Sequence, residues 1–362
     1  MQKIIEGIDK LQEIIETIGC RKMFMVIDSS YPFLNIKDQI EQTAVTKVCF
    51  SDFCPNPLFE DVCKGIDLFK KQECDTILSV GGGSSIDVAK CIKLAVLARE
   101  GNDALIPPLV SKQVEIDGKR LPFIAIPTTA GTGSESTHNA VMYYQGAKQT
   151  VTNDGVLPDF ALLEPKVLAT LPLYQKKCTM MDALCQGIES WWSVNSTDES
   201  KGYSKTAVQL ITENWHKYIF DNDAYAASKI MLAANYAGRA INISATTAAH
   251  AMSYKITSLY KLPHGHAVAV CLPEIWEYML KKEPGFTVFN EISQAMGFDC
   301  PRNAIEGFRK MMSEMELKNP VAGKRETELQ ILSTSVNPVR LKNNPIIIDE
   351  ATAWDLYNSI VL

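Results

Sequence analysis

The stretch Asp75-Thr-Ile-Leu-Ser-Val-Gly-Gly-Gly-Ser-Ser-Ile-Asp-Val-Ala-Lys90 decides the fold of this chain. Its apolar residues before the glycines are typical of a buried strand, and those after them follow the spacing of a helix. A strand, a glycine turn and a helix bring backbone N–H groups and a positive helix end to a phosphate. Ser84 is a candidate cap for that helix. The stretch therefore predicts a nucleotide site, although the same residues also suit a tight turn without a ligand.

A second strand and loop support the nucleotide interpretation. Phe123–Pro127 is apolar and runs into the loop 128–135, which is rich in glycine and hydroxyl residues. Two such loops, each following a strand, predict a parallel sheet with a ligand at its carboxyl edge. The glycine spacing matches neither GxGxxG nor GxxxxGK(S/T). We predict further strands over 22–27, 45–50, 150–156 and 160–163, helices over 3–18 and 58–71, and a loop over 100–120.

Asp28 follows the predicted strand 22–27. A carboxylate at that position can accept from a ribose hydroxyl and would repel a 2′-phosphate, which favours NAD(H) over NADP(H). A cap or turn role explains the same residue nearly as well.

Composition excludes several classes of protein. The chain has 362 residues, of which 46% are hydrophobic and 22% charged, a balance typical of soluble globular proteins. Its net charge of −6 offers no basic surplus for nucleic acid or an acidic membrane face. No apolar run reaches the roughly 18 residues of a membrane span, and no secretory signal is visible. The ten cysteines form no CxxC pair, which favours free thiols in the cytoplasm.

The pattern of the sequence changes at Pro165. Long helical patterns replace strand signals, at roughly 176–192, 201–219, 224–243, 246–259 and 267–281. The segment 320–345 is rich in Pro, Asn and Lys and is expected to be irregular. We predict two domains: an α/β dinucleotide-binding domain over 1–164 and an all-helical metal- and substrate-binding domain over 165–362.

The helical half carries residues with the chemistry of a metal site. Asp182 and Gln186 are four residues apart and share one helix face. His250 lies in a predicted helix, and His264 follows Pro263. One Asp and two or three His suit a divalent ion with positions left for substrate. Each histidine taken singly is more often structural or surface-exposed.

Taken together, these motifs resemble the iron-containing (group III) alcohol dehydrogenase family over nearly the whole chain, up to Asn337-Pro-Val-Arg340. The matching segments are GGGSSIDVAK at 81–90, IPTTAGTGSE at 126–135, MDALCQGIE at 181–189, Ala249-His250, and Pro263-His264-Gly265. The resemblance implies a Rossmann-like α/β N-terminal domain plus an all-α C-terminal domain, an architecture shared with dehydroquinate synthase. It also implies NAD(P)-dependent interconversion of an alcohol and an aldehyde by a cytoplasmic homodimer.

The resemblance assigns roles residue by residue. Asp28 stands where the family selects NAD. The pyrophosphate and adenosine side falls to Gly82, Gly83, Ser84 and Asp87. The nicotinamide end falls to Thr128, Thr129, Thr132 and Lys148. The metal ligands are Asp182, His250 and His264.

Two residues depart from the family pattern. Gln186 replaces a histidine ligand, and its amide oxygen is a weaker, harder ligand, so iron becomes less favoured relative to zinc. Relatives similar to glycerol dehydrogenases manage with one Asp and two His, so a metal is still expected. Tyr254 stands where a further histidine is common. Its phenol and His266 are candidate proton relays in a reaction at His250 and His264, although Tyr254 also suits packing.

The segments 191–200, 237–243 and 250–257 resemble the branch of the family that contains phosphonoacetaldehyde reductases. That branch converts phosphonoacetaldehyde to 2-hydroxyethylphosphonate. A dianionic substrate needs fixed cations, and Arg239 and Lys255 are candidates, with Asn139 as an added donor. Both basic residues also suit a solvated helix face.

Three alternative functions are open from the sequence. One is a dehydrogenase for a small uncharged alcohol or diol, of the lactaldehyde or propanediol type. Another is a dehydroquinate-synthase-like lyase, which needs a denser basic pocket than the sequence shows. The third is a degenerate enzyme that binds a nucleotide without turnover, favoured only by Gln186.

Overall fold

The computed structural model describes residues 2–110, 112–116, 118 and 120–362. Residues 111, 117 and 119 of the predicted loop 100–120 lie outside the described part. The chain divides into two compact units, Met1–Leu171 and Pro172–Leu362. Our predicted boundary after residue 164 falls before η6 (Pro165–Thr170), which the division assigns to the first unit. The roles given to the two domains stay predictions.

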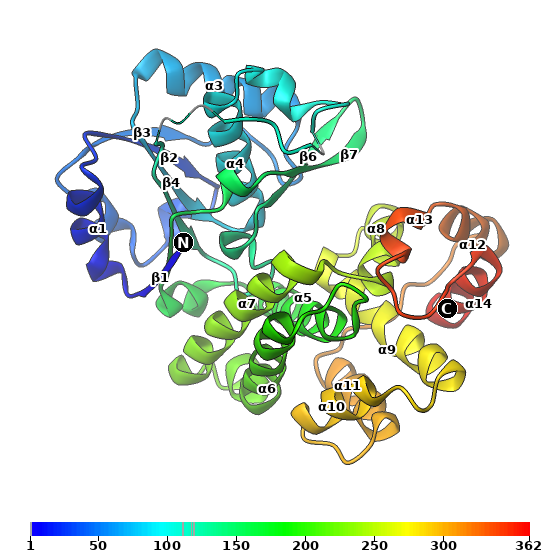
Figure 1. Cartoon of the computed structure of the whole chain (residues 1–362). Coiled ribbons are helices and arrows are strands. Elements are labelled where there is room, and N and C mark those ends of the chain that lie inside the picture. The colour runs from blue at the N-terminus through cyan, green and yellow to red at the C-terminus, as the bar shows by residue number, and fades with distance from the viewer. Residues whose placement is uncertain (1, 111, 117, 119) are drawn as a thin grey trace. The chain divides into compact units, whose positions relative to one another are not determined.

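A parallel sheet forms the centre of the first unit (Figure 1). Its strands are β1 (Lys3–Glu6), β2 (Lys22–Ile27), β3 (Thr46–Phe50), β4 (Thr76–Gly81), β5 (Phe123–Pro127) and β8 (Phe160–Leu163). Their order across the sheet is β1-β8-β5-β4-β2-β3, and each neighbouring pair is parallel. Gly81 at the end of β4 is in register with Pro127 at the end of β5. The glycine and threonine loops therefore leave adjacent strands at one sheet edge, as predicted.

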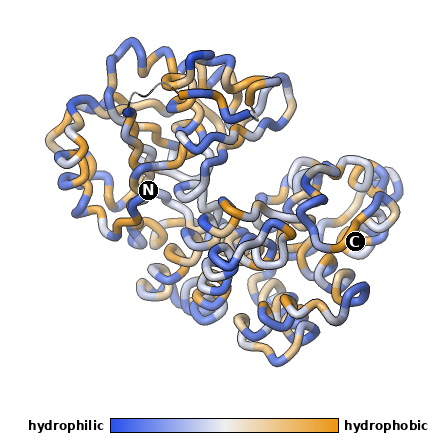
Figure 2. The backbone as a smooth tube through the Cα atoms, viewed as in Figure 1, coloured by the Kyte–Doolittle hydropathy of each residue, from blue (hydrophilic) through white to orange (hydrophobic). Residues whose placement is uncertain are grey.

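Helices enclose this sheet. They are α1 (Leu11–Ile18), α2 (Lys37–Glu41), α3 (Phe59–Gln72) and α4 (Gly83–Leu97), with short 3₁₀ turns η1 (Ile8–Lys10), η2 (Tyr31–Phe33), η3 (Gly101–Leu105), η4 (Ser134–Ser136) and η5 (Asp154–Val156). Every residue of β4 and β5 is buried, so both faces of the sheet centre are covered. The hydrophobic residues accordingly concentrate inside each unit, with hydrophilic residues on its loops (Figure 2).

The predicted helix over 3–18 is wrong in its first third. Lys3–Glu6 instead forms β1, which pairs with β8 from Lys3↔Phe160 to Glu6↔Leu163. Gly7 follows with φ of 92°, a conformation that a helix cannot contain. The isoleucines fit a helical period, but pairing with a strand more than 150 residues away in the sequence is the stronger constraint.

The predicted strand over 150–156 is also corrected. β6 (Asn139–Tyr144), which the sequence did not indicate, pairs antiparallel with β7 (Ala147–Thr152) in a two-stranded sheet of its own. The residues after β7 form η5. The turn of this hairpin, Gln145-Gly146, has positive φ at both residues, which matches the right-handed twist of the strands.

The second unit is helical, as predicted. Its helices are α5 (Leu173–Trp192), α6 (Asp198–Phe220), α7 (Ala224–Ser244), α8 (Ala248–Tyr260), α9 (His264–Lys282), α10 (Thr287–Ala295), α11 (Pro301–Glu314), α12 (Arg325–Thr334), α13 (Pro338–Leu341) and α14 (Glu350–Ile360). α5 packs against α6, α7 and α9, and all of its residues from Met180 to Trp192 are buried. A helix buried on every side is the core element of a bundle.

The irregular tail predicted over 320–345 contains two helices, α12 and α13. Leu329 and Leu332 of α12 are buried, and α12 packs against α14. The Glu328 carboxylate accepts from the backbone N–H groups of Gly323 and Lys324, which stabilises the start of this helix. A short helix with few apolar residues depends on such tertiary packing, so its periodicity in the sequence is weak.

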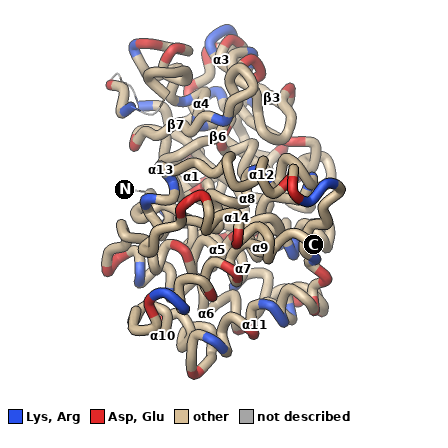
Figure 3. The backbone as a smooth tube through the Cα atoms, turned by 90° about the vertical axis from the view of Figure 1, so that its right-hand side faces the viewer, with Lys and Arg blue, Asp and Glu red and all other residues tan. Residues whose placement is uncertain are grey.

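Charged residues of both signs are interspersed along the chain rather than gathered into one field (Figure 3). None of the helices in the described residues is long and apolar enough to cross a bilayer.

The close approach of α9 to α5 depends on one glycine. A Cβ added at Gly265 would lie 2.0 Å from the backbone oxygen of Cys178 and 2.8 Å from Cβ of Asp182. Asp182 and the neighbouring His264 are both predicted metal ligands, so this contact brings two of them together.

Replacing Gly265 with Ala should force α9 away from α5. We expect the free energy of unfolding in urea to fall by about 3 kcal/mol, because a backbone carbonyl blocks the added methyl group. Gly202→Ala is the control, since a Cβ there meets nothing within 4 Å and the helix α6 should gain roughly 0.5 to 1 kcal/mol. Equal stability of Gly265→Ala and the wild type would contradict this packing argument.

Candidate active site

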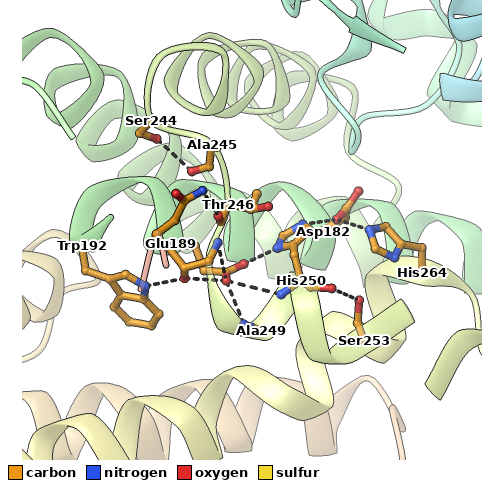
Figure 4. Close-up of polar contacts among 12 residues, drawn as sticks. Asp182, Glu189, Trp192, Ser244, Ala245, Thr246, Ala249, His250, Ser253 and His264 are labelled. Carbon is orange, nitrogen blue, oxygen red and sulfur yellow. Dashed lines mark hydrogen bonds and ion pairs between the residues drawn. The ribbon is translucent and has the colours of Figure 1, made fainter. Parts of the chain in front are cut away.

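Three side chains of the second unit meet in one cluster (Figure 4). Asp182 comes from α5, His250 from α8 and His264 from the first residue of α9. Nε2 of His250 lies 3.3 Å from Oδ1 of Asp182, and Nε2 of His264 lies 3.9 Å from the same oxygen. The side chains of Asp182 and His250 are each 5% exposed, whereas that of His264 is 39% exposed. The cluster is thus buried on one side and open on the other.

The spacing of these atoms fits a divalent ion. The ligand atoms all lie within 4.8 Å of one another. Two donors bound to one zinc ion at about 2.0–2.2 Å are separated by roughly 3 to 3.5 Å. The observed distances therefore need only a small adjustment. One carboxylate and two imidazoles leave a coordination position for substrate, as catalytic sites require.

Glu189 contacts His250 on the side of its ring that faces away from Asp182. Its Oε2 contacts Nδ1 of His250, so that Nε2 is the nitrogen directed toward Asp182. Its Oε1 accepts from the backbone N–H groups of Thr247, Ala249 and His250 at 3.0, 2.9 and 3.3 Å, and from the Thr247 hydroxyl at 2.7 Å. One fully buried carboxylate thus caps the N-terminus of α8 and fixes a ligand on it.

The protonation of His250 follows from this setting. Burial alone lowers the pKa of His250, but the charges and hydrogen bonds of Glu189 and Asp182 outweigh burial and raise it to about 9. At neutral pH the metal-free imidazole is therefore protonated. Metal binding has to release that proton from Nε2, which is a general feature of histidine ligands.

Two of the three loop glycines are required by packing within the first unit. A Cβ at Gly81 would lie 2.5 Å from Oδ2 of Asp28, and one at Gly83 would lie 2.9 Å from Cγ2 of Thr132. A Cβ at Gly82 would meet only ordinary contacts with Thr129. Gly82 also has φ of −75°, which any residue adopts. Protein packing thus does not explain its lack of a side chain, whereas close approach of a ligand to its backbone would.

Asp28 and Ser84 lie beside this turn. Oδ2 of Asp28 accepts from the Gly82 N–H at 3.2 Å and from the Ser85 hydroxyl at 3.1 Å. The carboxylate therefore holds the glycine turn as well as standing at the end of β2. The predicted capping role of Ser84 is wrong, because Gly82 is the N-cap of α4 and no side chain caps it. The Ser84 hydroxyl instead accepts from the backbone N–H of Asn56 at 3.4 Å.

A buried lysine supports the threonine loop. Nζ of Lys90, which is 0% exposed, donates to Ser134 Oγ at 3.1 Å, Thr137 Oγ1 at 2.9 Å and the Asn139 carbonyl at 2.7 Å. Burial lowers the pKa of Lys90 to about 8, opposed by the charges of Asp87 and Glu135. The amine is still mostly protonated at pH 7, so it supplies all three bonds.

Asp87 completes this network. Its Oδ1 accepts from the Ser134 hydroxyl at 2.7 Å and its Oδ2 from the Val141 N–H at 3.0 Å. The predicted cofactor residue Asp87 therefore ties α4 to the threonine loop and to β6. Thr132 acts inside the loop as well, since its Oγ1 accepts from the Ser134 N–H at 3.2 Å.

Comparison with known proteins identifies the family. The sequence profile for iron-containing alcohol dehydrogenase matches residues 2–165. The profile for the C-terminal part of the Fe-containing alcohol dehydrogenase family matches residues 177–361. The chain belongs to the iron-containing alcohol dehydrogenase family. It is therefore an oxidoreductase that acts on alcohols, in a family that uses NAD(H) and a metal.

Relatives within the iron-containing alcohol dehydrogenases differ in their named substrates. NAD-dependent methanol dehydrogenase from Bacillus methanolicus is 31% identical over 275 residues, which cover 74% of this chain and 70% of that protein. A crystal structure of 1,3-propanediol oxidoreductase has a TM-score of 0.90 at 24% identity and covers 99% of this chain and 97% of its own. Sulfoacetaldehyde reductase from Bifidobacterium kashiwanohense in complex with NAD⁺ also has a TM-score of 0.90 at 24% identity, covering 99% and 96%. The two structures show the shared fold.

The residues predicted to act beside the cluster differ in what they contact. Gln186, where the family usually has a histidine, lies one turn after Asp182 on α5 and is 4% exposed. Tyr254 stacks on the His264 ring with centroids 5.7 Å apart and an angle of 6° between the planes. His266 is directed elsewhere, with Nδ1 bonded to the Tyr174 hydroxyl and Nε2 to the Lys318 carbonyl. Of the two predicted proton relays, only Tyr254 contacts a cluster residue in the described contacts.

Each predicted substrate residue has its own surroundings within its unit. Arg239 lies over the Tyr203 ring at 4.0 Å and donates to the Tyr203 hydroxyl. Lys255 is on α8, five residues after His250, and so points about 140° away from it around the helix. Asn139 and Lys148 belong to the hairpin β6–β7 of the first unit, where the Asn139 side chain accepts from Thr152 at 2.8 Å.

Glu189 and Lys90 were missed as functional residues, although both lie within the quoted motifs. Glu189 is seven residues after Asp182 and so shares its helix face. A carboxylate in a predicted buried helix requires hydrogen-bond or charge partners, so the presence of Glu189 among apolar residues was the available signal. Lys90 gave a similar signal, since it interrupts an apolar helix face after Ile86 and Ala89.

Replacing Glu189 with Gln should weaken metal binding about 10- to 100-fold while the fold is retained, because the amide no longer presents a carboxylate to Nδ1 of His250. Metal content after dialysis against a buffered free-metal series measures this effect. Glu291→Gln is the matched control, since its carboxylate accepts from Trp191 Nε1 at 3.1 Å from an exposed position of α10. Unchanged metal affinity of Glu189→Gln would show that Glu189 only caps α8.

Replacing Lys90 with Met should lower the free energy of unfolding by about 3 kcal/mol, because three oxygens lose their shared donor and Asp87 loses a compensating charge. We also expect weaker binding of NADH in a fluorescence titration, since the threonine loop loses its support. Lys71→Met removes a charge from an exposed position of α3 and should change neither quantity. Wild-type stability and NADH affinity in Lys90→Met would refute this role.

Proposed function

We propose that this chain catalyses the NAD(H)-dependent, metal-assisted reduction of a small aldehyde to a primary alcohol, and that its substrate is phosphonoacetaldehyde, which yields 2-hydroxyethylphosphonate. The observation that carries the reaction type is the cluster of Asp182, His250 and His264 with Glu189 behind it. Membership of the iron-containing alcohol dehydrogenases supports the same reaction type.

The cluster residues and their neighbours have different roles in the proposed reaction. A divalent ion bound by Asp182, His250 and His264 would act as a Lewis acid toward the carbonyl, with zinc or iron as the candidates. Glu189 keeps Nε2 of His250 directed at the cluster. Tyr254 packs on His264, and its phenol is our candidate for delivering a proton to the product oxygen.

The glycine and threonine loops are our proposed cofactor site. Gly82, Gly83, Ser84 and Asp87 are assigned to the pyrophosphate and adenosine side, and Thr128, Thr129, Thr132 and Lys148 to the nicotinamide end. We propose NAD(H) over NADP(H) because the carboxylate of Asp28 at the end of β2 would repel a 2′-phosphate. A cytoplasmic homodimer stays a prediction from the family resemblance.

The substrate proposal rests on sequence similarity to phosphonoacetaldehyde reductases in three segments of the helical unit. That sulfoacetaldehyde reductase shares the fold is consistent with an anionic two-carbon aldehyde. The competing candidate is a small neutral alcohol or diol. It is favoured by the names of two relatives, 1,3-propanediol oxidoreductase and methanol dehydrogenase.

The test is NADH and NADPH oxidation with phosphonoacetaldehyde and with lactaldehyde, before and after chelation and after zinc or ferrous ion is restored. We expect a preference for NADH and phosphonoacetaldehyde, and activity that is lost on chelation and regained with metal. His250→Ala should lower kcat by at least about 10³-fold, because the cluster loses a ligand and Glu189 loses its partner. His216→Ala, on an exposed position of α6, is the control.

Each outcome separates one part of the proposal from the rest. Higher kcat/KM for lactaldehyde would replace the phosphonate substrate with a neutral alcohol. Activity that ignores chelation and survives His250→Ala would reject the metal role of the cluster. Absence of turnover with tight NADH binding would favour the degenerate enzyme.

A further inference from the structure

A series of rings leads from the cluster to a guanidinium group. The rings of His250 and His264 have centroids 5.4 Å apart. Tyr254 stacks on His264 with centroids 5.7 Å apart, and Cζ of Arg340 lies 5.5 Å from the centroid of the Tyr254 ring. The four residues come from α8, α9 and α13 of the second unit. Arg340 is therefore one aromatic ring beyond a proposed metal ligand.

We infer that Arg340 binds the anionic group of the substrate and sets the preference for charged aldehydes. This inference rests on the proposed aldehyde reduction at Asp182, His250 and His264. The substrate class is a two-carbon aldehyde that carries a tetrahedral oxyanion, either a phosphonate or a sulfonate.

The short substrate restricts which cation can serve. Only three covalent bonds separate the carbonyl oxygen of such an aldehyde from its phosphorus or sulfur atom. A guanidinium N–H reaches an oxyanion over about 2.8 Å. The cation must therefore lie near the cluster, and the contact of Arg340 with Tyr254, whose ring stacks on His264, makes Arg340 the candidate.

The chemistry of Arg340 suits this task. Its planar guanidinium presents paired N–H donors that match two oxygens of a phosphonate or sulfonate, which a lysine does not. Its side chain is partly buried, so its charge is less screened than that of a fully exposed residue. The contact with the Tyr254 ring restrains the guanidinium before substrate binds.

The two cations predicted from the sequence are less well placed. The guanidinium of Arg239 lies against Tyr203 and Tyr236, on α6 and α7. Lys255 points about 140° away from His250 around α8, whereas Tyr254 is only about 40° from it. Arg340 is thus the basic residue whose described contacts lead to the cluster.

The experiment compares Arg340→Ala, Arg340→Lys, Arg239→Ala and Lys255→Ala with phosphonoacetaldehyde, sulfoacetaldehyde and lactaldehyde. We expect Arg340→Ala to lose about 100-fold in kcat/KM for the charged aldehydes, mainly through KM, and less than about 3-fold for lactaldehyde. Arg340→Lys should recover only part of this loss, because lysine cannot bind in bidentate fashion. Phosphonate and sulfonate arms identify which oxyanion the site prefers.

A binding measurement separates this role from catalysis. Calorimetric titration of ethylphosphonate into the metal-free protein should show binding to the wild type and at least about 10-fold weaker binding to Arg340→Ala. Arg302→Ala removes the same charge from an exposed position of α11 and should leave ethylphosphonate affinity unchanged. Thermal unfolding of each variant reports any purely structural effect.

Four results would overturn the inference. Equal loss for charged and neutral aldehydes, with a lower Tm, would make Arg340 a packing residue of α13. A selective loss in Arg239→Ala or Lys255→Ala but not in Arg340→Ala would return the role to the sequence-predicted cations. A wild type that prefers lactaldehyde and does not bind ethylphosphonate would reject the charged substrate itself, whereas a charge preference that survives Arg340→Ala rejects the inference alone.

Discussion

The carboxylate of Glu189 is the group on which the helical unit depends. A fully buried charge is tolerated only where all of its lone pairs are satisfied. Here the start of α8 satisfies one oxygen and His250 satisfies the other. The position of α8 relative to α5 and the orientation of His250 are therefore set by the same requirement. Because Asp182 lies two turns earlier on α5, the distance between these two ligands follows from it.

The position of the third predicted ligand, His264, depends on the lack of a side chain at Gly265. Gly265 lets α9 approach the backbone of α5 at Cys178, and His264 is the residue before it. A paired carboxylate and a glycine contact on one helix thus bring together the three predicted metal ligands from three helices. Glycines and a buried charge have the same role in the first unit. The lack of a side chain at Gly81 and Gly83 lets Asp28 and Thr132 approach the backbone, and Lys90 supports the threonine loop by a hydrogen bond to Thr137. Both predicted sites are thus organised by protein contacts, and such preorganisation would reduce the ordering cost of ligand binding.

In our proposal, reaction type and substrate choice are carried by different parts of the chain. The relatives of this chain have named substrates as different as methanol and sulfoacetaldehyde. Tyr254 and Arg340 lie at the edge of the cluster, on α8 and on the four-residue helix α13. On this proposal, a member of the family could change its substrate at the edge of the site without disturbing the residues proposed to hold the reacting oxygen.

The sequence by itself determined the parallel sheet, the glycine and threonine loops at its carboxyl edge, the helical second half and the three cluster residues. Each of these leaves a signal within about 20 residues, as a period, a glycine run or a fixed spacing. The tertiary structure alone decided that residues 3–6 are a strand, that α12 forms, and that Glu189, Lys90 and Arg340 have the partners described above. Glu189 meets His250 across 61 residues and Lys90 meets Asn139 across 49. Local patterns carry no information about such pairs, because the partner of a buried charge is chosen by the packing of whole helices.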